Sequence, residues 1–110
     1  MNTQIANNEE INDIVKVILN AVPALEIYIF GSFANGTARE DSDYDFYVVI
    51  PDGIQPIETT WKITGSIPRE IKRKRSIDML VGTMSKFNKY RNALGFIEDE
   101  VVKTGVKLYG

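Results

Sequence analysis

Residues 25–50 constrain the fold of this chain more strongly than any other stretch. An apolar run that alternates with polar residues ends at Gly31-Ser32, a polar segment follows, and a second apolar run covers residues 46–50. Alternation with a period of two indicates a strand, and glycine followed by polar residues indicates a turn. The stretch therefore predicts two strands joined through a tight turn.

Two carboxylates precede the second apolar run. Asp43 and Asp45 are one residue apart, so on a strand both side chains share a face, with backbones roughly 7 Å apart. Such carboxylates repel each other and favour a cation, and Mg²⁺, which prefers oxygen ligands, usually arrives with substrate phosphates. Gly31 lets backbone N–H groups approach an anion, while Ser32 adds a hydroxyl and can begin a helix. The stretch thus predicts a site for Mg²⁺ and phosphate.

Other readings of the aspartates and glycines fit less well. An EF-hand loop that began at Asp41 would need Gly at position six and Glu at position twelve, where the chain has Phe46 and Asp52. Gly31 and Gly36 have P-loop spacing, but the lysine that reaches the phosphates is missing. A solvated acidic turn at residues 41–45 stays open as the structural alternative.

Composition narrows the classes of function. The 110 residues, 44% of them hydrophobic, predict one domain over residues 1–110. Without cysteine or histidine, acid–base chemistry falls to carboxylates. The net charge of −2 argues against a general nucleic-acid binder. No apolar run has the length of a membrane span and no leader pattern opens the chain, so we expect a soluble cytoplasmic protein.

The hydrophobic pattern predicts an α/β or α+β fold: a mixed sheet of three to five strands, with helices packed mainly on one face. Trp61 is expected to pack on the sheet, and Phe96, Ile97, Val101 and Val102 on the inner side of the last helix. Strands are predicted at residues 25–29, 43–50, 77–81 and 106–109, and helices at 9–22, 32–35, 55–64, 68–74, 85–93 and 94–104.

One basic cluster stands out. It consists of Arg69, Lys72, Arg73, Lys74 and Arg75. Three roles remain open for it: a solvated helix end whose cations favour the C-terminal dipole, steering of a triphosphate, or docking of an acidic partner.

The spacing Gly31-Ser32, ten residues, Asp43-Tyr44-Asp45 resembles the GS-x10-DxD motif of the DNA polymerase beta-type nucleotidyltransferase superfamily. Within it, GSFANGTAREDSDYD resembles the minimal nucleotidyltransferase (MNT) proteins, which commonly accompany a HEPN-domain protein in toxin–antitoxin pairs. The family needs a third carboxylate on a later strand, and Asp78 matches it. The resemblance runs from about residue 10 to the C-terminus and implies a polymerase beta-like fold.

The resemblance also implies roles. Asp43 and Asp45 would hold two Mg²⁺ ions and the triphosphate of a nucleotide, expected to be ATP. Gly31 and Ser32 would bind the β and γ phosphates. Asp78 would ligate the catalytic metal and accept the proton of the attacking hydroxyl. The implied reaction moves AMP onto a hydroxyl of a partner protein of the HEPN class, with this chain as the antitoxin.

One position departs from the family pattern. Related sequences often have Arg where this chain has Asn35, which leaves Arg39 as the nearest cation in the loop and the residue expected to bind the nucleotide there. This keeps open a non-catalytic antitoxin or scaffold with a vestigial nucleotide site. Transfer to an RNA end or an antibiotic is disfavoured, because little of the chain remains to build a substrate domain.

If a partner supplies the acceptor, the isolated chain should turn over nucleotides slowly, and exposed apolar residues near the site should mark the docking surface. The candidates are Phe33, Phe46, Tyr47 and Phe87, of which at least two are expected to pack in the core instead.

Overall fold

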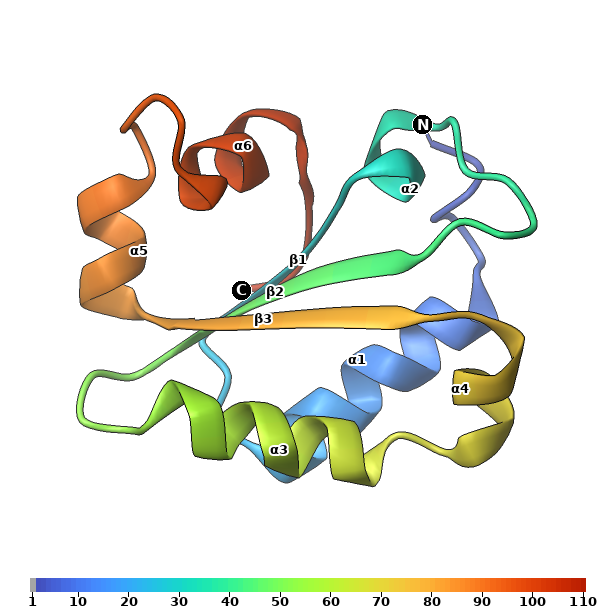
Figure 1. Ribbon diagram of the computed structural model, residues 1–110, viewed down its shortest axis with the longest axis horizontal. Coiled ribbons are helices and arrows are strands. Elements are labelled where there is room, and N and C mark those ends of the chain that lie inside the picture. The colour runs from blue at the N-terminus through green and yellow to red at the C-terminus, as the bar shows by residue number, and fades with distance from the viewer. Residues whose placement is uncertain (1) are drawn as a thin grey trace.

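The computed structural model describes residues 2–110, which form four strands and six helices (Figure 1). Most of the predicted elements are present. In chain order they are α1 (Glu9–Ala21), β1 (Glu26–Phe30), α2 (Ser32–Asn35), β2 (Tyr44–Ile50), α3 (Pro56–Ser66), α4 (Arg69–Lys74), β3 (Ile77–Thr83), α5 (Met84–Tyr90), α6 (Ile97–Thr104) and β4 (Val106–Tyr109).

The strands form one mixed sheet in the order β3-β2-β1-β4. β1 runs antiparallel to both β2 and β4, whereas β2 and β3 are parallel. This confirms the predicted mixed sheet and the α+β class. It also places the start of β2 beside the end of β1 and beside the start of β3, so the motif residues of all three strands meet at one end of the sheet.

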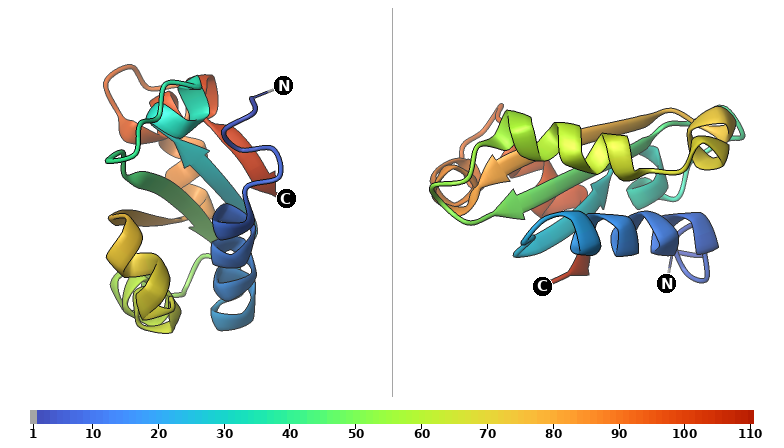
Figure 2. Two further views of the ribbon diagram at one scale, coloured as in Figure 1. Left: turned by 90° about the vertical axis from the view of Figure 1, so that its right-hand side faces the viewer. Right: turned by 90° about the horizontal axis from the view of Figure 1, so that it is seen from below.

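Helices cover the sheet unequally. α1, α3 and α4 lie on one face, and α5 and α6 on the other (Figure 1). Figure 2 shows α1 and α3 side by side across the first face. The larger core lies beneath them, with Ile14, Phe46 and Ile63 fully buried. A smaller core around Tyr47, Phe87 and Val101 joins α5 and α6 to the opposite face.

Local sequence explains how α1 begins and ends. The side chain of Asn8 accepts a hydrogen bond of 3.1 Å from the backbone N–H of Ile11, which caps the first turn. Val22 leaves the helix in an extended conformation directly before Pro23, because a residue that precedes proline disfavours the helical region. No helix within residues 2–110 is long and apolar enough to cross a membrane.

Several boundary predictions were wrong. β3 continues to Thr83 rather than ending at residue 81, and α5 ends at Tyr90 rather than residue 93. α3 continues through Gly65 to Ser66, because one glycine weakens a helix by only about 1 kcal/mol, and the break falls at Ile67-Pro68. α6 begins at Ile97 rather than residue 94, after Gly95, which adopts a φ of +92°.

Two packing predictions were also wrong. Trp61 is 65% exposed, because the buried side of α3 runs through Thr59 and Ile63 and turns residue 61 outward. At the start of α6, Phe96 and Ile97 are exposed, whereas Val101 is fully buried as predicted.

Candidate active site

The turn after β1 depends on glycine. Gly31 has a φ of +73° and a ψ of −149°, a region open essentially only to glycine. α2 follows at once and ends, as predicted, at Gly36, whose left-handed conformation lets its N–H donate to the carbonyl of Phe33 at 3.3 Å. A methyl group on Gly31 would lie 3.2 Å from the carboxyl carbon of Asp45 and closer still to Oδ2. The missing side chain therefore brings the turn against that carboxylate.

Asp45 and Asp78 lie side by side. They are partners in the parallel register of β2 and β3, so both side chains leave the same face of the sheet, about 5 Å apart at their Cα atoms. This is the face that carries Tyr47, with α5 and α6. Asp43 precedes β2 and is exposed. Asp78 therefore lies beside Asp45 on the neighbouring strand, as predicted, whereas Asp43, which was predicted on the same strand as Asp45, lies just before it.

This proximity changes the titration of the pair. Burial raises the pKa of Asp45 to about 6, and the hydrogen bond and charge of Asp78 act in the same direction. The charges of Asp43 and of Glu100 in α6 raise the pKa further. A carboxylate that is repelled by neighbouring negative charges binds a proton more readily than usual, and a bound cation would relieve the same repulsion.

The donor set suits Mg²⁺ without forming a complete cage. Within residues 2–110, no three carboxylates lie close enough together to enclose a metal ion by themselves. Asp45 and Asp78 nevertheless offer adjacent hard oxygen donors beside the Gly31 turn. Mg²⁺ commonly takes one or two carboxylates and completes its shell with water and phosphate oxygens. The residues present therefore fit such an ion when it arrives with a nucleotide.

Arg39 lies exposed in the loop between α2 and β2. Its backbone N–H donates to Oγ of Ser42 at 2.7 Å. In the described part of the chain no ion pair joins its guanidinium to the three aspartates. Its predicted contact with a nucleotide remains a prediction.

Arg75, one of the basic cluster, fixes this loop. Its guanidinium donates to the carbonyl oxygens of Arg39, at 3.0 Å, and of Ser42. It also stacks over the rings of Phe33 and Tyr44, at 5.0 and 5.2 Å from their centroids. In the sequence, Phe33 follows Ser32, and Tyr44 lies between Asp43 and Asp45. Sequence reasoning missed this role, because nothing local separates Arg75 from the four basic residues before it.

Residues before α1 hold this loop and α2 from another side. The side chain of Gln4 donates to the carbonyl of Ala38 at 2.7 Å and accepts from its N–H at 2.9 Å. The side chain of Asn2 donates to the carbonyls of Phe33 and Ala34. The family resemblance starts only at about residue 10, so it gave no signal for these contacts.

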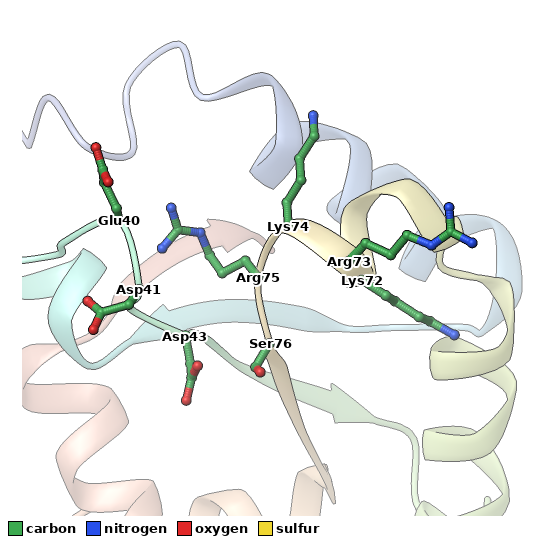
Figure 3. Close-up of a pocket in the computed structure, with 8 residues that line it drawn as sticks. All are labelled: Glu40, Asp41, Asp43, Lys72, Arg73, Lys74, Arg75 and Ser76. Atoms are coloured by element: carbon green, nitrogen blue, oxygen red, sulfur yellow. The ribbon is translucent and has the colours of Figure 1, made fainter.

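A pocket of about 230 Å³ lies beyond the strand ends, between the loop and α4 (Figure 3). Glu40, Asp41 and Asp43 line one side. Lys72, Arg73, Lys74 and Arg75 line the other, with Ser76 at the start of β3. Figure 3 shows the Arg75 side chain turned toward the loop and away from Lys72. Within the basic cluster, Arg75 therefore holds the loop between α2 and β2 in place.

A buried polar contact anchors α6 beside the site. The hydroxyl of Tyr47 donates to Oε2 of Glu98 at 2.7 Å, and Nζ of Lys86 lies 3.8 Å from the same oxygen. Burial, together with the Glu98 carboxylate, raises the pKa of Tyr47 far above its usual range. Gly82 leaves room for the Tyr47 ring, since a methyl group there would lie 3.0 Å from Cζ. Ile97, the residue before Glu98, lines a pocket together with Asp45 and Asp78.

The four aromatic candidates for a docking surface are buried. Phe33 is 5% exposed, Tyr47 is 2% exposed, and Phe46 and Phe87 are fully buried. Both faces of β2 are covered by helices, so alternate residues on either side enter a core. The exposed apolar side chains near the carboxylates are instead Leu80 and Ile97.

The turn, the paired aspartates and the sheet topology define a nucleotidyltransferase fold. Residues 9–110 match the family described as Polymerase beta, Nucleotidyltransferase, and the chain belongs to that family. This confirms the predicted superfamily and fold.

Individual relatives agree with this assignment. The chain is 27% identical over 100 residues to the protein adenylyltransferase MntA of Shewanella oneidensis, covering 90% of this chain and 64% of that relative. It thus spans less than two thirds of the curated relative it matches. A toxin–antitoxin crystal structure with AMP-PNP matches with a TM-score of 0.66 and 26% identity, over 90% of this chain and 72% of that one.

A nucleotidyltransferase structure from Sulfolobus solfataricus, with a TM-score of 0.62, 22% identity and coverage of 94% and 80%, shares the fold. The likeness to MntA agrees with the predicted resemblance to MNT proteins.

Proposed function

We propose that this chain is a Mg²⁺-dependent nucleotidyltransferase that moves AMP from ATP onto a hydroxyl of a partner protein, in the cytoplasm. The observation that carries the proposal is the pairing of Asp45 with Asp78 on neighbouring strands, with Asp45 against the Gly31 turn. Two relatives support the choice of nucleotide and acceptor: MntA is named a protein adenylyltransferase, and a similar toxin–antitoxin structure holds AMP-PNP.

Each motif residue has a part in this reaction. Asp43, Asp45 and Asp78 would hold two Mg²⁺ ions, which when bound stabilise charge on the attacking and leaving oxygens. Gly31 and Ser32 bind the β and γ phosphates, which orients the α-phosphorus over the carboxylates.

The chemical step is an in-line displacement. Asp78 accepts the proton of the acceptor hydroxyl, whose oxygen forms a bond to the α-phosphorus. The bond from the α-phosphorus to the bridging oxygen breaks, pyrophosphate leaves, and AMP stays on the acceptor. Asp78 suits the proton transfer because it is exposed on β3, directly beside Asp45.

The partner is proposed to be a HEPN-domain protein, with this chain as the antitoxin of the pair. The similarity to toxin–antitoxin structures supports this choice. The decisive experiment incubates the purified chain with ATP labelled at the α-phosphate, Mg²⁺ and the protein encoded by the adjacent gene. Label on that protein with the wild type, and none with Asp78→Asn, supports the transferase. A matched control is Asp13→Asn on the exposed side of α1.

A second function is favoured by one residue. Asn35 is exposed in α2 where related sequences often carry Arg, so the chain offers one phosphate-directed charge fewer. A non-catalytic antitoxin would form a tight complex with the neighbouring protein and transfer no label. The same experiment therefore separates the two functions.

Turnover is expected to depend on the partner. A purified chain with ATP and Mg²⁺ should release little pyrophosphate, because the acceptor must be held near attack distance. Addition of the partner should raise the steady-state rate of pyrophosphate release. Rapid turnover of a free small molecule by the chain alone would contradict partner dependence.

A further inference from the structure

The outer surface of α3 carries two large apolar side chains. Ile57 is 60% exposed and Trp61 is 65% exposed. They are four residues apart on the helix, so their side chains are neighbours on one face. Thr59 and Ile63 occupy the opposite face of α3 and are buried. Residues 2–110 therefore leave an apolar strip of tryptophan and isoleucine in contact with water, which is typical of an interaction surface.

Two opposite charges flank this strip on one side. Glu58 and Lys62 are exposed, and each follows an apolar residue of the strip by one position, so they form a second row one step around the helix. Within residues 2–110 neither of them takes part in an ion pair. Gly65, one turn after Trp61, is also exposed, and no atom of another part of the chain lies where its side chain would be. A second helix can therefore approach closely at this end of α3.

The order of the charges makes this face of α3 complementary to itself. Two copies of the helix that meet face to face about a twofold axis run antiparallel, and the same flank of each copy lies on the same side of the contact. With the axis near residue 60, Glu58 of one copy lies beside Lys62 of the other, and symmetry forms the reverse pair. The apolar strips of the two copies meet beside these two charge pairs. The antiparallel orientation also sets the two helix dipoles favourably.

We propose that the outer face of α3 binds a second copy of this chain in an antiparallel helix pair. Charge complementarity selects this occupant. An acidic surface would repel Glu58 and a basic surface would repel Lys62, whereas a second copy satisfies both charges with its own residues. Ile57 and Trp61 line neither of the pockets that contain the aspartates, so the proposal does not depend on the transferase function.

The size of the face indicates a weak dimer. α3 has 11 residues, and each copy contributes one tryptophan and one isoleucine to the apolar centre. An interface of this kind lies below the roughly 1,200 Å² that is usual for stable complexes. We therefore expect a dissociation constant of roughly 10–100 μM, with the dimer population rising with protein concentration.

The test is sedimentation equilibrium of the intact chain over a range of concentrations that brackets this value, combined with fluorescence. Trp61 is the only tryptophan in the sequence, so its emission reports on this face alone. As concentration rises, the mean mass should move from monomer toward dimer, the Trp61 emission should shift to shorter wavelength, and its quenching by iodide should fall. A monomer throughout, or a dimer with unchanged Trp61 emission, would overturn the proposal.

Charge reversal tests whether the occupant is a second copy. Glu58→Lys and Lys62→Glu should each weaken self-association several-fold, because each sets like charges opposite one another. An equal mixture of these two variants should recover the wild-type dimer, since each variant then meets its opposite charge on the other. Loss in both variants without recovery in the mixture would refute the antiparallel pairing.

A change at the centre of the face should have the largest effect. Trp61→Ser should weaken self-association more than about tenfold and leave thermal unfolding of the dilute monomer unchanged, because the side chain is exposed. Leu94→Ser is the matched control, since Leu94 is 88% exposed and lies outside α3. Equal loss of dimer in the control would refute specific pairing. A blue shift of Trp61 that appears only when the protein encoded by the adjacent gene is added would assign the face to that partner and overturn the proposal.

Discussion

Replacing Asp45 by asparagine should stabilise the metal-free protein at neutral pH. Burial, then the hydrogen bond and charge of Asp78, raise the pKa of Asp45 to about 6 in the folded state. A carboxyl group with a folded pKa above its unfolded value lowers stability when it ionises. This loss of folding free energy is absent below about pH 4, grows between roughly pH 4 and 6, and is constant above that range. The asparagine variant lacks this loss.

The size of the effect follows from the shift and the exposure of the group. A rise from the ordinary pKa of 3.8 to about 6 corresponds to at most about 3 kcal/mol. Asp45 is only half-buried and borders an open pocket, so solvent screens part of the repulsion. We expect a gain of about 1 kcal/mol, or roughly 4–6 °C in Tm for a chain of this size.

Thermal unfolding in the presence of a chelator measures this gain. Wild type, Asp45→Asn and the surface control Asp13→Asn are compared at about pH 4 and about pH 8. The Asp45 variant should exceed wild type only at the higher pH, and the control should match wild type at both. An equal gain at both pH values, or a loss at the higher one, would refute the account. With Mg²⁺ and AMP-PNP added, wild type should gain more than the variant, because ligand binding stabilises the folded state.

Two further substitutions test how the Gly31 turn and the loop between α2 and β2 are held. Gly31→Ala should lower the free energy of unfolding by more than about 1 kcal/mol and abolish AMP-PNP binding, because the new methyl group meets the Asp45 carboxyl. The control is Gly53→Ala, which is also at positive φ but in open space. This control should keep its nucleotide affinity in calorimetry. Arg75→Met should lower the free energy of unfolding in urea by about 1–3 kcal/mol and speed amide exchange in residues 36–43, because Arg75 holds this loop. The control Arg73→Met should change neither quantity. Slow exchange in the Arg75 variant would contradict a positioning role.

Local patterns were enough to predict the frame of the site. Alternation fixed which residues of β2 share a face, and Gly31 and Gly36 marked the bounds of α2. The pairing of Asp45 with Asp78 involves residues far apart in the chain. It was expected because the family resemblance supplied the third carboxylate, and the parallel register of β2 and β3 confirms the proximity. The roles of these residues in catalysis remain predictions.

Contacts over long sequence separation account for what the sequence did not reveal. Arg75 reaches back to Arg39 and Ser42, and Gln4 reaches forward to Ala38. No periodicity or spacing in the sequence distinguishes Arg75 or Gln4 from an arginine or glutamine that only faces solvent. Burial of all four aromatic candidates has a related cause: helices on both faces of the sheet place both sides of β2 in a core.

The distribution of hydrogen bonds suggests why the site tolerates its own repulsion. Asp45 and Asp78 are held together by the parallel pairing of β2 with β3, which continues for five further residues beyond them to Ile50 and Thr83. The loop between α2 and β2 is fixed by Arg75 and Gln4, whose contacts lie on backbone carbonyls and an N–H and not on the carboxylates. The scaffold can therefore stay in place whether the carboxylates are protonated, ionised or bound to a cation. A ligand that neutralises them gains the relieved repulsion without having to reorganise the loop, which is the condition for a preorganised electrostatic site.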